Sequence, residues 1–81
     1  MPKIKSVKAL DNYILEITFD DGKKVHYDMK NDMNTLPNYY KLGENDLFNN
    51  YHLSESRAFV IWTEEIDLPS DILYEYGVEV Q

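Results

Sequence analysis

The sequence contains no cysteine, so it can form no disulfide and offers no thiolate ligand to a metal ion. Its three glycines, Gly22, Gly43 and Gly77, are too widely spaced to form a glycine-rich phosphate loop. No apolar stretch approaches the roughly 18–20 residues that a membrane-spanning helix requires. The N-terminal residues 1–5 lack the apolar core of a secretory signal peptide, so we expect a cytoplasmic protein with no membrane partner.

Basic residues are nearly absent from the C-terminal half. All seven lysines lie at or before Lys41. After Gly43, Arg57 is the only Lys or Arg, against nine acidic residues. Up to Gly43 the chain therefore carries about +1, and beyond it about −8, within a net charge of −7. This charge disfavours direct binding to nucleic-acid phosphates, whereas a basic protein would complement the acidic half. The alternative is that the acidic side chains only keep a small domain in solution.

The residues that are present suffice for one small domain. The 81 residues are 43% hydrophobic and 14% aromatic, which is enough for a core. A chain of this length buries only roughly 60–65% of its unfolded surface, so modest stability is expected. We predict a single domain over residues 1–81, ordered from about residue 3 to residue 77.

A β-hairpin is predicted within residues 13–28, where apolar and polar residues alternate on both sides of a turn. A two-residue turn would set Ile17 opposite His26 and separate the apolar faces. A three-residue loop with a left-handed Gly22 sets Ile17 opposite Val25 instead. Because a one-residue slip turns every side chain to the other face, the second register is preferred.

The remaining segments predict a mixed fold. We expect a bulged edge strand over residues 4–10, a loop over 29–37, helical turns over 39–42 and 45–48, a second hairpin over 51–62, a bridge at Ile66, a helix from Pro69 to Gly77 and a loose tail over 78–81. The apolar run 58–62 is typical of a central strand covered on both faces. The prediction is an α+β fold: a small antiparallel sheet of about four to five strands, a short helical crossover and a C-terminal helix. The predicted core comprises Val7, Leu15, Ile17, Phe19, Val25, Tyr27, Leu42, Phe48, Phe59, Val60, Ile61, Trp62, Ile72 and Leu73.

The order of motifs resembles that of a known family. It runs Val7, Tyr13-x-Leu15-x-Ile17-x-Phe19-x-Asp21-Gly22, Tyr27-Asp28, Leu42 with Phe48, Ile61-Trp62, Ile66-Asp67-Leu68-Pro69 and Leu73-Tyr74. This pattern, from about Ile4 to Tyr74, is similar to the small bacterial domain of unknown function 2442. Many members carry a glycine in the turn after the tryptophan, where this chain has Glu64-Glu65.

The resemblance implies an α+β fold with no established activity. Some members of the family are followed by a helix-turn-helix DNA-binding domain, and we expect none here because the sequence ends at Gln81. Others look like products of bacterial two-gene units similar to toxin–antitoxin pairs. The family offers no catalytic residue, so none is assigned.

One polar cluster is a candidate for chemistry. His26 and Asp28 share a strand face, and with Asp67 they could form an acid/base or metal cluster. A solvated strand face explains the same pattern more simply. We therefore predict no catalytic residue, no metal site and no cofactor.

The predicted function is a non-enzymatic protein–protein interaction module, in the context of a bacterial two-gene regulatory or toxin–antitoxin-like unit. Trp62 is expected in the core, with an interface anchor as the alternative. The predicted binding residues are Trp62, Glu64, Glu65, Asp67 and Tyr74. Self-association stays open, as do two other functions. One is a nucleic-acid-linked transcriptional regulator with a basic face of Lys3, Lys5, Lys8, Lys23 and Lys24. The other is a small metal-dependent hydrolase that uses His26, Asp28 or Asp67.

Overall fold

The computed structural model describes all 81 residues, Met1–Gln81, and contains seven strands with short helices between them. The elements along the chain are β1 (Ile4–Leu10), η1 (Asp11–Tyr13), β2 (Ile14–Phe19), β3 (Lys24–Asp28), α1 (Lys30–Thr35), η2 (Tyr39–Gly43), η3 (Leu47–Asn49), β4 (His52–Leu53), β5 (Phe59–Thr63), β6 (Ile66–Pro69), α2 (Ser70–Tyr76) and β7 (Val78–Val80).

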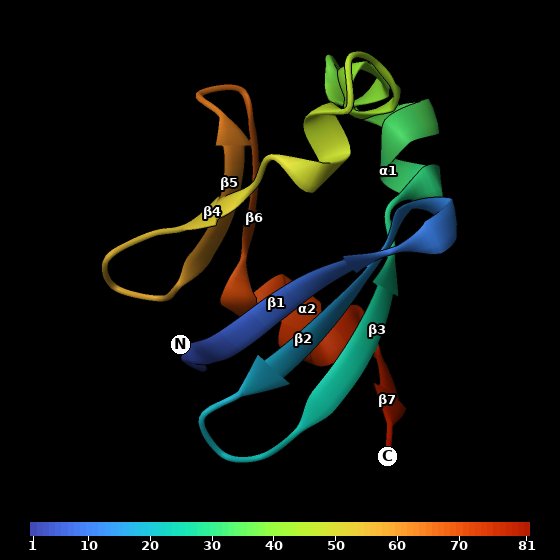
Figure 1. Cartoon of the computed structure of the whole chain (residues 1–81). Helices are drawn as coiled ribbons and strands as arrows, with labels where there is room; N and C mark the ends of the chain where they lie inside the picture. Colours follow the sequence, from blue (N-terminus) through green and yellow to red (C-terminus); the bar gives the residue numbers. More distant parts are fainter.

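The strands form two antiparallel sheets. A four-stranded sheet has the order β1-β2-β3-β7, and a three-stranded sheet has the order β4-β5-β6. Helix α2 lies behind the four-stranded sheet, while α1 and its neighbouring short helices gather at one end of the molecule (Figure 1). The predicted α+β fold with a helical crossover and a C-terminal helix is confirmed, with the strands divided between two sheets.

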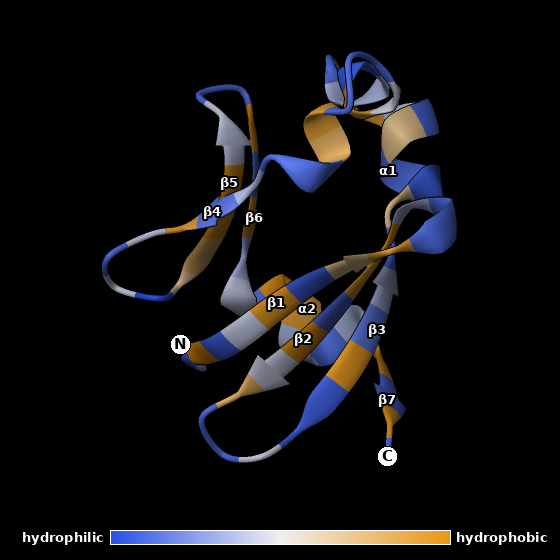
Figure 2. Cartoon of the chain, viewed as in Figure 1, coloured by the Kyte–Doolittle hydropathy of each residue, from blue (hydrophilic) through white to orange (hydrophobic).

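The predicted hairpin register is confirmed. Ile17 lies opposite Val25 in the β2–β3 pair. The backbone N–H of Phe19 donates to the carbonyl of Lys23 at 2.8 Å, which closes a three-residue loop, and Gly22 has the left-handed φ of +93°. The alternation of apolar and polar bands along these strands is visible in Figure 2.

Strand β1 is the predicted bulged edge strand, with a register shift between Ile4 and Ser6. Its free edge is tied to the second sheet. The Ile4 N–H donates to the carbonyl of Arg57 at 2.9 Å, and the Tyr51 hydroxyl donates to the carbonyl of Val7 at 2.8 Å. These bonds use backbone groups that would otherwise be open to pairing with another chain.

The predicted loop over residues 29–37 is wrong, because it contains helix α1. The Asp28 carboxylate accepts the Lys30 N–H at 2.9 Å, and the Tyr27 hydroxyl donates to Asp32 at 2.7 Å. Met29 is fully buried at the start of the helix. Contacts with the rest of the protein thus hold a segment whose Asn- and Asp-rich composition favours a loop.

Two short strands replace elements that the sequence left irregular. The residues expected as a loose tail form β7, which pairs with β3, and the bridge expected at Ile66 is the four-residue strand β6. Gly77 makes the pairing of β7 with β3 possible. A Cβ atom there would lie 2.7 Å from Cγ2 of Val25, so only glycine lets the chain pass this close to β3.

The core lies between the two sheets and α2. It comprises Ile4, Leu15, Ile17, Phe19, Val25, Met29, Tyr39, Leu42, Phe48, Val60, Trp62, Ile66, Leu68 and Leu73. Five residues predicted in the core are only half-buried: Val7, Tyr27, Phe59, Ile61 and Ile72. Strand β5 is central, as predicted, but its Phe59 and Ile61 face is only partly covered, because nothing in the chain packs fully against it. None of the helices has the length and apolar character needed to span a bilayer.

Candidate functional site

Trp62 belongs to the core. Its side chain is 6% exposed, and its indole Nε1 donates to the carbonyl of Phe48 at 2.9 Å. The two rings stack with their centroids 6.3 Å apart. This buried, hydrogen-bonded position holds the η3 segment against β5, and it leaves Trp62 unavailable as a direct interface anchor.

Tyr74 braces the β2–β3 hairpin from α2. Its ring meets Phe19 edge to face at 4.8 Å, and the Lys23 ammonium lies 4.0 Å from the ring centroid. Its hydroxyl donates to Asp21 at 2.6 Å, and this hydrogen bond lowers the pKa of the Asp21 carboxyl. The β2–β3 turn and the β5–β6 turn lie at opposite ends of the molecule, so the predicted binding residues do not form one site (Figure 1).

The structure does not bring His26, Asp28 and Asp67 together. His26 Nε2 lies 2.9 Å from Glu16 on the neighbouring strand, and this hydrogen bond lowers the pKa of the Glu16 carboxyl. Asp28 pairs with Lys30 at 3.0 Å. Asp67 lies in the other sheet, and no group of three His, Cys, Asp or Glu side chains is placed to hold a metal ion.

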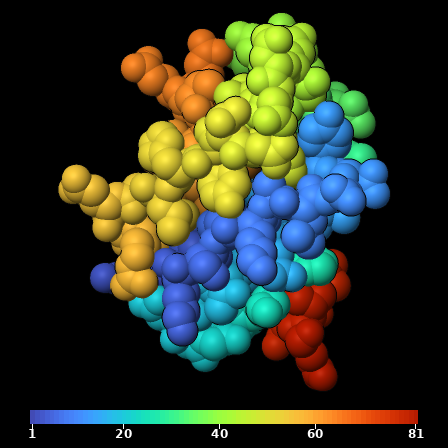
Figure 3. Space-filling view, in the orientation of Figure 1, coloured from blue at the N-terminus to red at the C-terminus, as the bar shows by residue number.

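Glu64 and Glu65 form the exposed turn between β5 and β6, next to η2. The Lys41 ammonium lies 4.0 Å from the Glu65 carboxylate, and the Tyr39 hydroxyl donates to the backbone carbonyl of Asp67 at 2.6 Å. These contacts fix η2 beside the hairpin. In Figure 3 the orange tip of the hairpin projects beside the yellow-green η2–η3 region.

This arrangement gathers negative charge at one end of the molecule. We call Glu44, Glu64, Glu65 and Asp67 the acidic end; all four side chains belong to exposed residues. Of the nine acidic residues after Gly43, only Glu65 has a Lys or Arg nitrogen as near as 4.0 Å. The acidic end is therefore a surface whose charge the chain itself leaves almost uncompensated.

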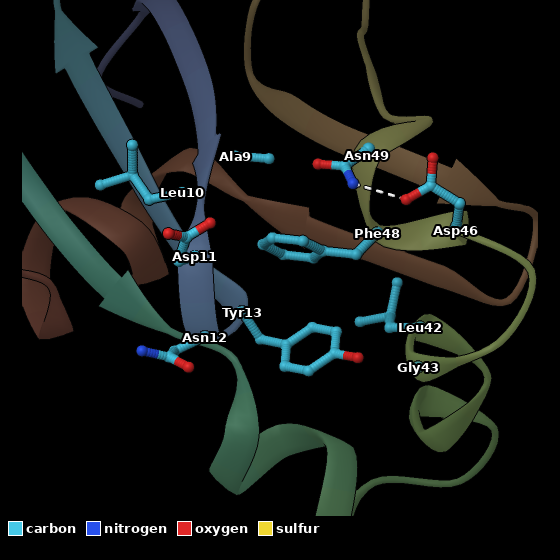
Figure 4. Close-up of a pocket in the computed structure, with 10 residues that line it drawn as sticks. All are labelled: Ala9, Leu10, Asp11, Asn12, Tyr13, Leu42, Gly43, Asp46, Phe48 and Asn49. Atoms are coloured by element: carbon cyan, nitrogen blue, oxygen red, sulfur yellow. Dashed lines mark hydrogen bonds between the residues drawn. The ribbon is translucent and has the colours of Figure 1, made fainter.

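An open cavity of about 450 Å³ lies between the β1–β2 turn and the η2–η3 segment (Figure 4). Its apolar lining comes from Ala9, Leu10, Tyr13, Leu42 and Phe48. Its other lining residues are Asp11, Asn12, Gly43, Asp46 and Asn49. Figure 4 shows the Tyr13 and Phe48 rings next to each other in the middle of this group of residues; their centroids are 5.3 Å apart, in an edge-to-face contact.

Several polar groups of the cavity have no partner within the protein. No hydrogen bond involves the Asp11 carboxylate, the Asn12 amide or the Tyr13 hydroxyl. The Asp46 carboxylate accepts one hydrogen bond, from the Asn49 amide at 2.6 Å. The Asp11 and Asp46 carboxylates thus offer acceptors for a ligand's donors in a cavity that Tyr13 also lines.

Left-handed backbone shapes this cavity from two sides. Asn12 and Tyr13 have φ of 63° and 60° on one side, and Asn45 and Asp46 have φ of 51° and 58° on the other. Positive φ is tolerated by Asn and Asp but is unusual for an aromatic residue. The sequence did not predict this cavity, and its only signal for it is the pair of Asn/Asp doublets, Asp11-Asn12 and Asn45-Asp46.

The family is identified by sequence similarity. The protein is a small α+β domain of two antiparallel sheets. Residues 4–79 match the family described as "Protein of unknown function (DUF2442)", so the chain belongs to this family. The resemblance found in the sequence is confirmed. No curated protein matches the chain.

One solved structure has the same fold. It is the crystal structure of the "Putative DNA Binding Protein NE0471" of Nitrosomonas europaea, with a TM-score of 0.81 and 23% identity. The similarity covers 95% of this chain but 49% of that one, so this chain spans about half the length of its structural neighbour. At this identity the likeness establishes the fold.

Proposed function

We propose that this domain is a non-enzymatic protein–protein interaction module whose acidic end binds a basic surface of another protein. The observation that carries the proposal is the uncompensated charge of Glu44, Glu64, Glu65 and Asp67. Complementary charge raises the association rate and selects among partners. The turn that presents Glu64 and Glu65 joins the paired strands β5 and β6 and contacts η2 through Lys41, which limits the entropy lost on binding.

A protein fits this surface better than a nucleic acid does. The chain has a net charge of −7, so its field repels phosphate backbones. Of the lysines predicted to form a basic face, Lys23 is engaged by Tyr74, to whose backbone carbonyl it donates at 3.0 Å. A bacterial two-gene unit of the toxin–antitoxin kind is one setting in which such a module would meet its partner.

A second candidate is a component of a nucleic-acid-linked regulator. It is favoured by the structural neighbour, which is named "Putative DNA Binding Protein" and is about twice as long as this chain. In this case the domain itself contributes a protein contact, and DNA binding belongs to another part of the assembly. A mobility-shift titration of the isolated chain at low salt is expected to be flat, because phosphate contacts are strongest there. No observation favours the hydrolase, since Asp67 lies in the other sheet from His26 and Asp28 and no three such side chains are placed to hold a metal ion.

The test is affinity purification of the tagged chain from its native host, with mass spectrometry of the proteins recovered. We expect a stoichiometric partner with a basic surface. It should be lost from the double variant Glu64→Lys/Glu65→Lys and should dissociate as salt is raised.

The matched control is Glu55→Lys/Asp71→Lys, which makes the same change in net charge at two exposed residues outside the acidic end. Glu55 lies in the β4–β5 turn, at the opposite end of β5 from Glu64. Equal loss of the partner from both double variants would show a net-charge effect and would contradict a defined acidic interface. Recovery of no partner would contradict the function itself.

A further inference from the structure

We propose that the cavity between the β1–β2 turn and the η2–η3 segment binds the guanidinium group of an arginine side chain. This inference rests on the proposed function, because the basic partner supplies the arginine. The cavity would bind this arginine beside the acidic end. Glu44, which belongs to the acidic end, lies in the chain between Gly43 and Asp46, and both of these residues line the cavity.

The aromatic walls of the cavity suit a planar cation. Tyr13 and Phe48 meet edge to face with centroids 5.3 Å apart. Phe48 is fixed from behind by its stacking on Trp62 and by the hydrogen bond from the indole to its carbonyl. Phe48 is only 4% exposed, so the half-buried Tyr13 ring is the aromatic surface open to a ligand; the face of such a ring is negatively polarised and attracts a guanidinium ion. The walls are thus formed before the ligand arrives, which limits the cost of binding.

The polar lining includes two carboxylates, those of Asp11 and Asp46. The Asp11 carboxylate and the Tyr13 hydroxyl have no hydrogen bond within the protein, and the Asp46 carboxylate has one. No Lys, Arg or His lines the space. At the rim, the Lys30 ammonium donates to the Asn12 carbonyl at 2.6 Å and lies 3.0 Å from the Asp28 carboxylate.

Size and donor geometry favour arginine over other cations. A volume of about 450 Å³ falls at the small end of ligand sites, which suits one long side chain rather than a folded element. Arginine presents five donors in a planar fork, so it can stack on an aromatic ring and still reach carboxylates at the edge. Lysine is a compact point charge and can use only one of these features well.

The probe for the test is N-acetyl-arginine-N-methylamide, titrated into the purified full chain and followed by the NMR signals of the Trp62 indole N–H and the Asn49 side-chain amide. Both groups are tied to the cavity wall. We expect saturable shifts with the arginine probe. The corresponding citrulline probe is nearly isosteric but uncharged, and it should bind at least about fivefold more weakly because it cannot form charge-assisted bonds.

Two variants locate the binding. Asp11→Asn removes one unpaired carboxylate and should weaken the arginine probe at least about fivefold. Glu55→Gln is the control, because it makes the same change of charge at an exposed residue far along the chain. The Glu55 side chain takes part in no hydrogen bond or ion pair, so this variant should leave the affinity for the arginine probe unchanged. Tyr13→Phe keeps the ring and should retain most of the binding.

Several results would overturn the proposal: no saturable shift, equal binding of the citrulline probe, or equal effects of Asp11→Asn and Glu55→Gln. Tighter binding of free arginine than of the capped probe would assign the cavity to a small molecule rather than to a partner's side chain. The titration needs no partner, so it can fail independently of the proposed function. A partner that is lost from Glu64→Lys/Glu65→Lys but retained by Asp11→Asn would refute the cavity alone.

Discussion

Gly77 is the position at which adding a single methyl group should lower the free energy of unfolding most. A Cβ atom at this position would lie 2.6 Å from the Leu73 carbonyl oxygen, 2.7 Å from Cγ2 and 2.8 Å from Cβ of Val25. Real Cβ atoms do not approach other atoms this closely, and Val25 is fully buried and paired on both sides, so it cannot move aside. Either the end of α2 or the β3–β7 pair must shift.

The magnitude follows from the cost of overpacking a filled core, roughly 1–3 kcal/mol. We place Gly77→Ala near the upper end, at about 2–3 kcal/mol, because the obstruction includes a backbone atom and a β-branched side chain. For a domain of this size each kcal/mol lowers Tm by roughly 4–8 °C, so a fall of roughly 10–20 °C is expected.

The assay is urea and thermal unfolding followed by circular dichroism, with Gly43→Ala as the matched control. A Cβ atom at Gly43 would meet only ordinary contacts, 3.5 Å from Met33 and 3.6 Å from the Tyr13 hydroxyl, and Gly43 lacks a positive φ. Gly43→Ala should therefore be neutral or slightly stabilising, because it restricts the unfolded chain. If the two variants unfold within about 0.5 kcal/mol of each other, the close passage of residue 77 beside β3 is refuted.

Three further predictions concern polar groups. Ser70 is fully buried and its hydroxyl has no partner, so Ser70→Ala should stabilise the protein by about 1 kcal/mol in urea unfolding; a loss of stability would show a missed hydrogen bond. Burial, and then the hydrogen bond to Asp32, raise the pKa of Tyr27 above its usual 10.0. Its contribution to stability is therefore complete below pH 10 and falls as pH rises above 10, and an unchanged alkaline profile in Tyr27→Phe would contradict this. The Tyr74 hydroxyl lowers the pKa of Asp21, so an NMR titration of Tyr74→Phe should show that pKa rising toward 3.8; no rise would exclude the hydrogen bond.

Local patterns were enough to predict the elements whose side chains alternate cleanly. The β2–β3 register follows from the two-residue period around Gly22, because a slip of one residue would expose Ile17 and Val25. Strand β7 could not be found this way. Its three residues have no pattern of their own, and they are held by pairing with β3, more than fifty residues earlier in the chain.

The two candidate sites also differ in how far the sequence predicts them. The acidic end was visible in the sequence because Glu64 and Glu65 occupy a predicted turn in a stretch poor in lysine. The cavity was not visible, because it depends on two left-handed segments, at Tyr13 and at Asp46, that are distant in sequence. An aromatic residue with positive φ is set by the surrounding structure rather than by local preference.

The most direct test of the acidic end is a side-by-side measurement of partner recovery, normalised to bait, for the wild-type chain, Glu64→Lys/Glu65→Lys and Glu55→Lys/Asp71→Lys. The account predicts a basic protein recovered in equal amount by the wild-type chain and the control, and at least about tenfold less by the acidic-end variant, as expected for reversal of two interface charges. Equal recovery by all three chains would contradict the claim that the acidic end is where this domain binds its partner.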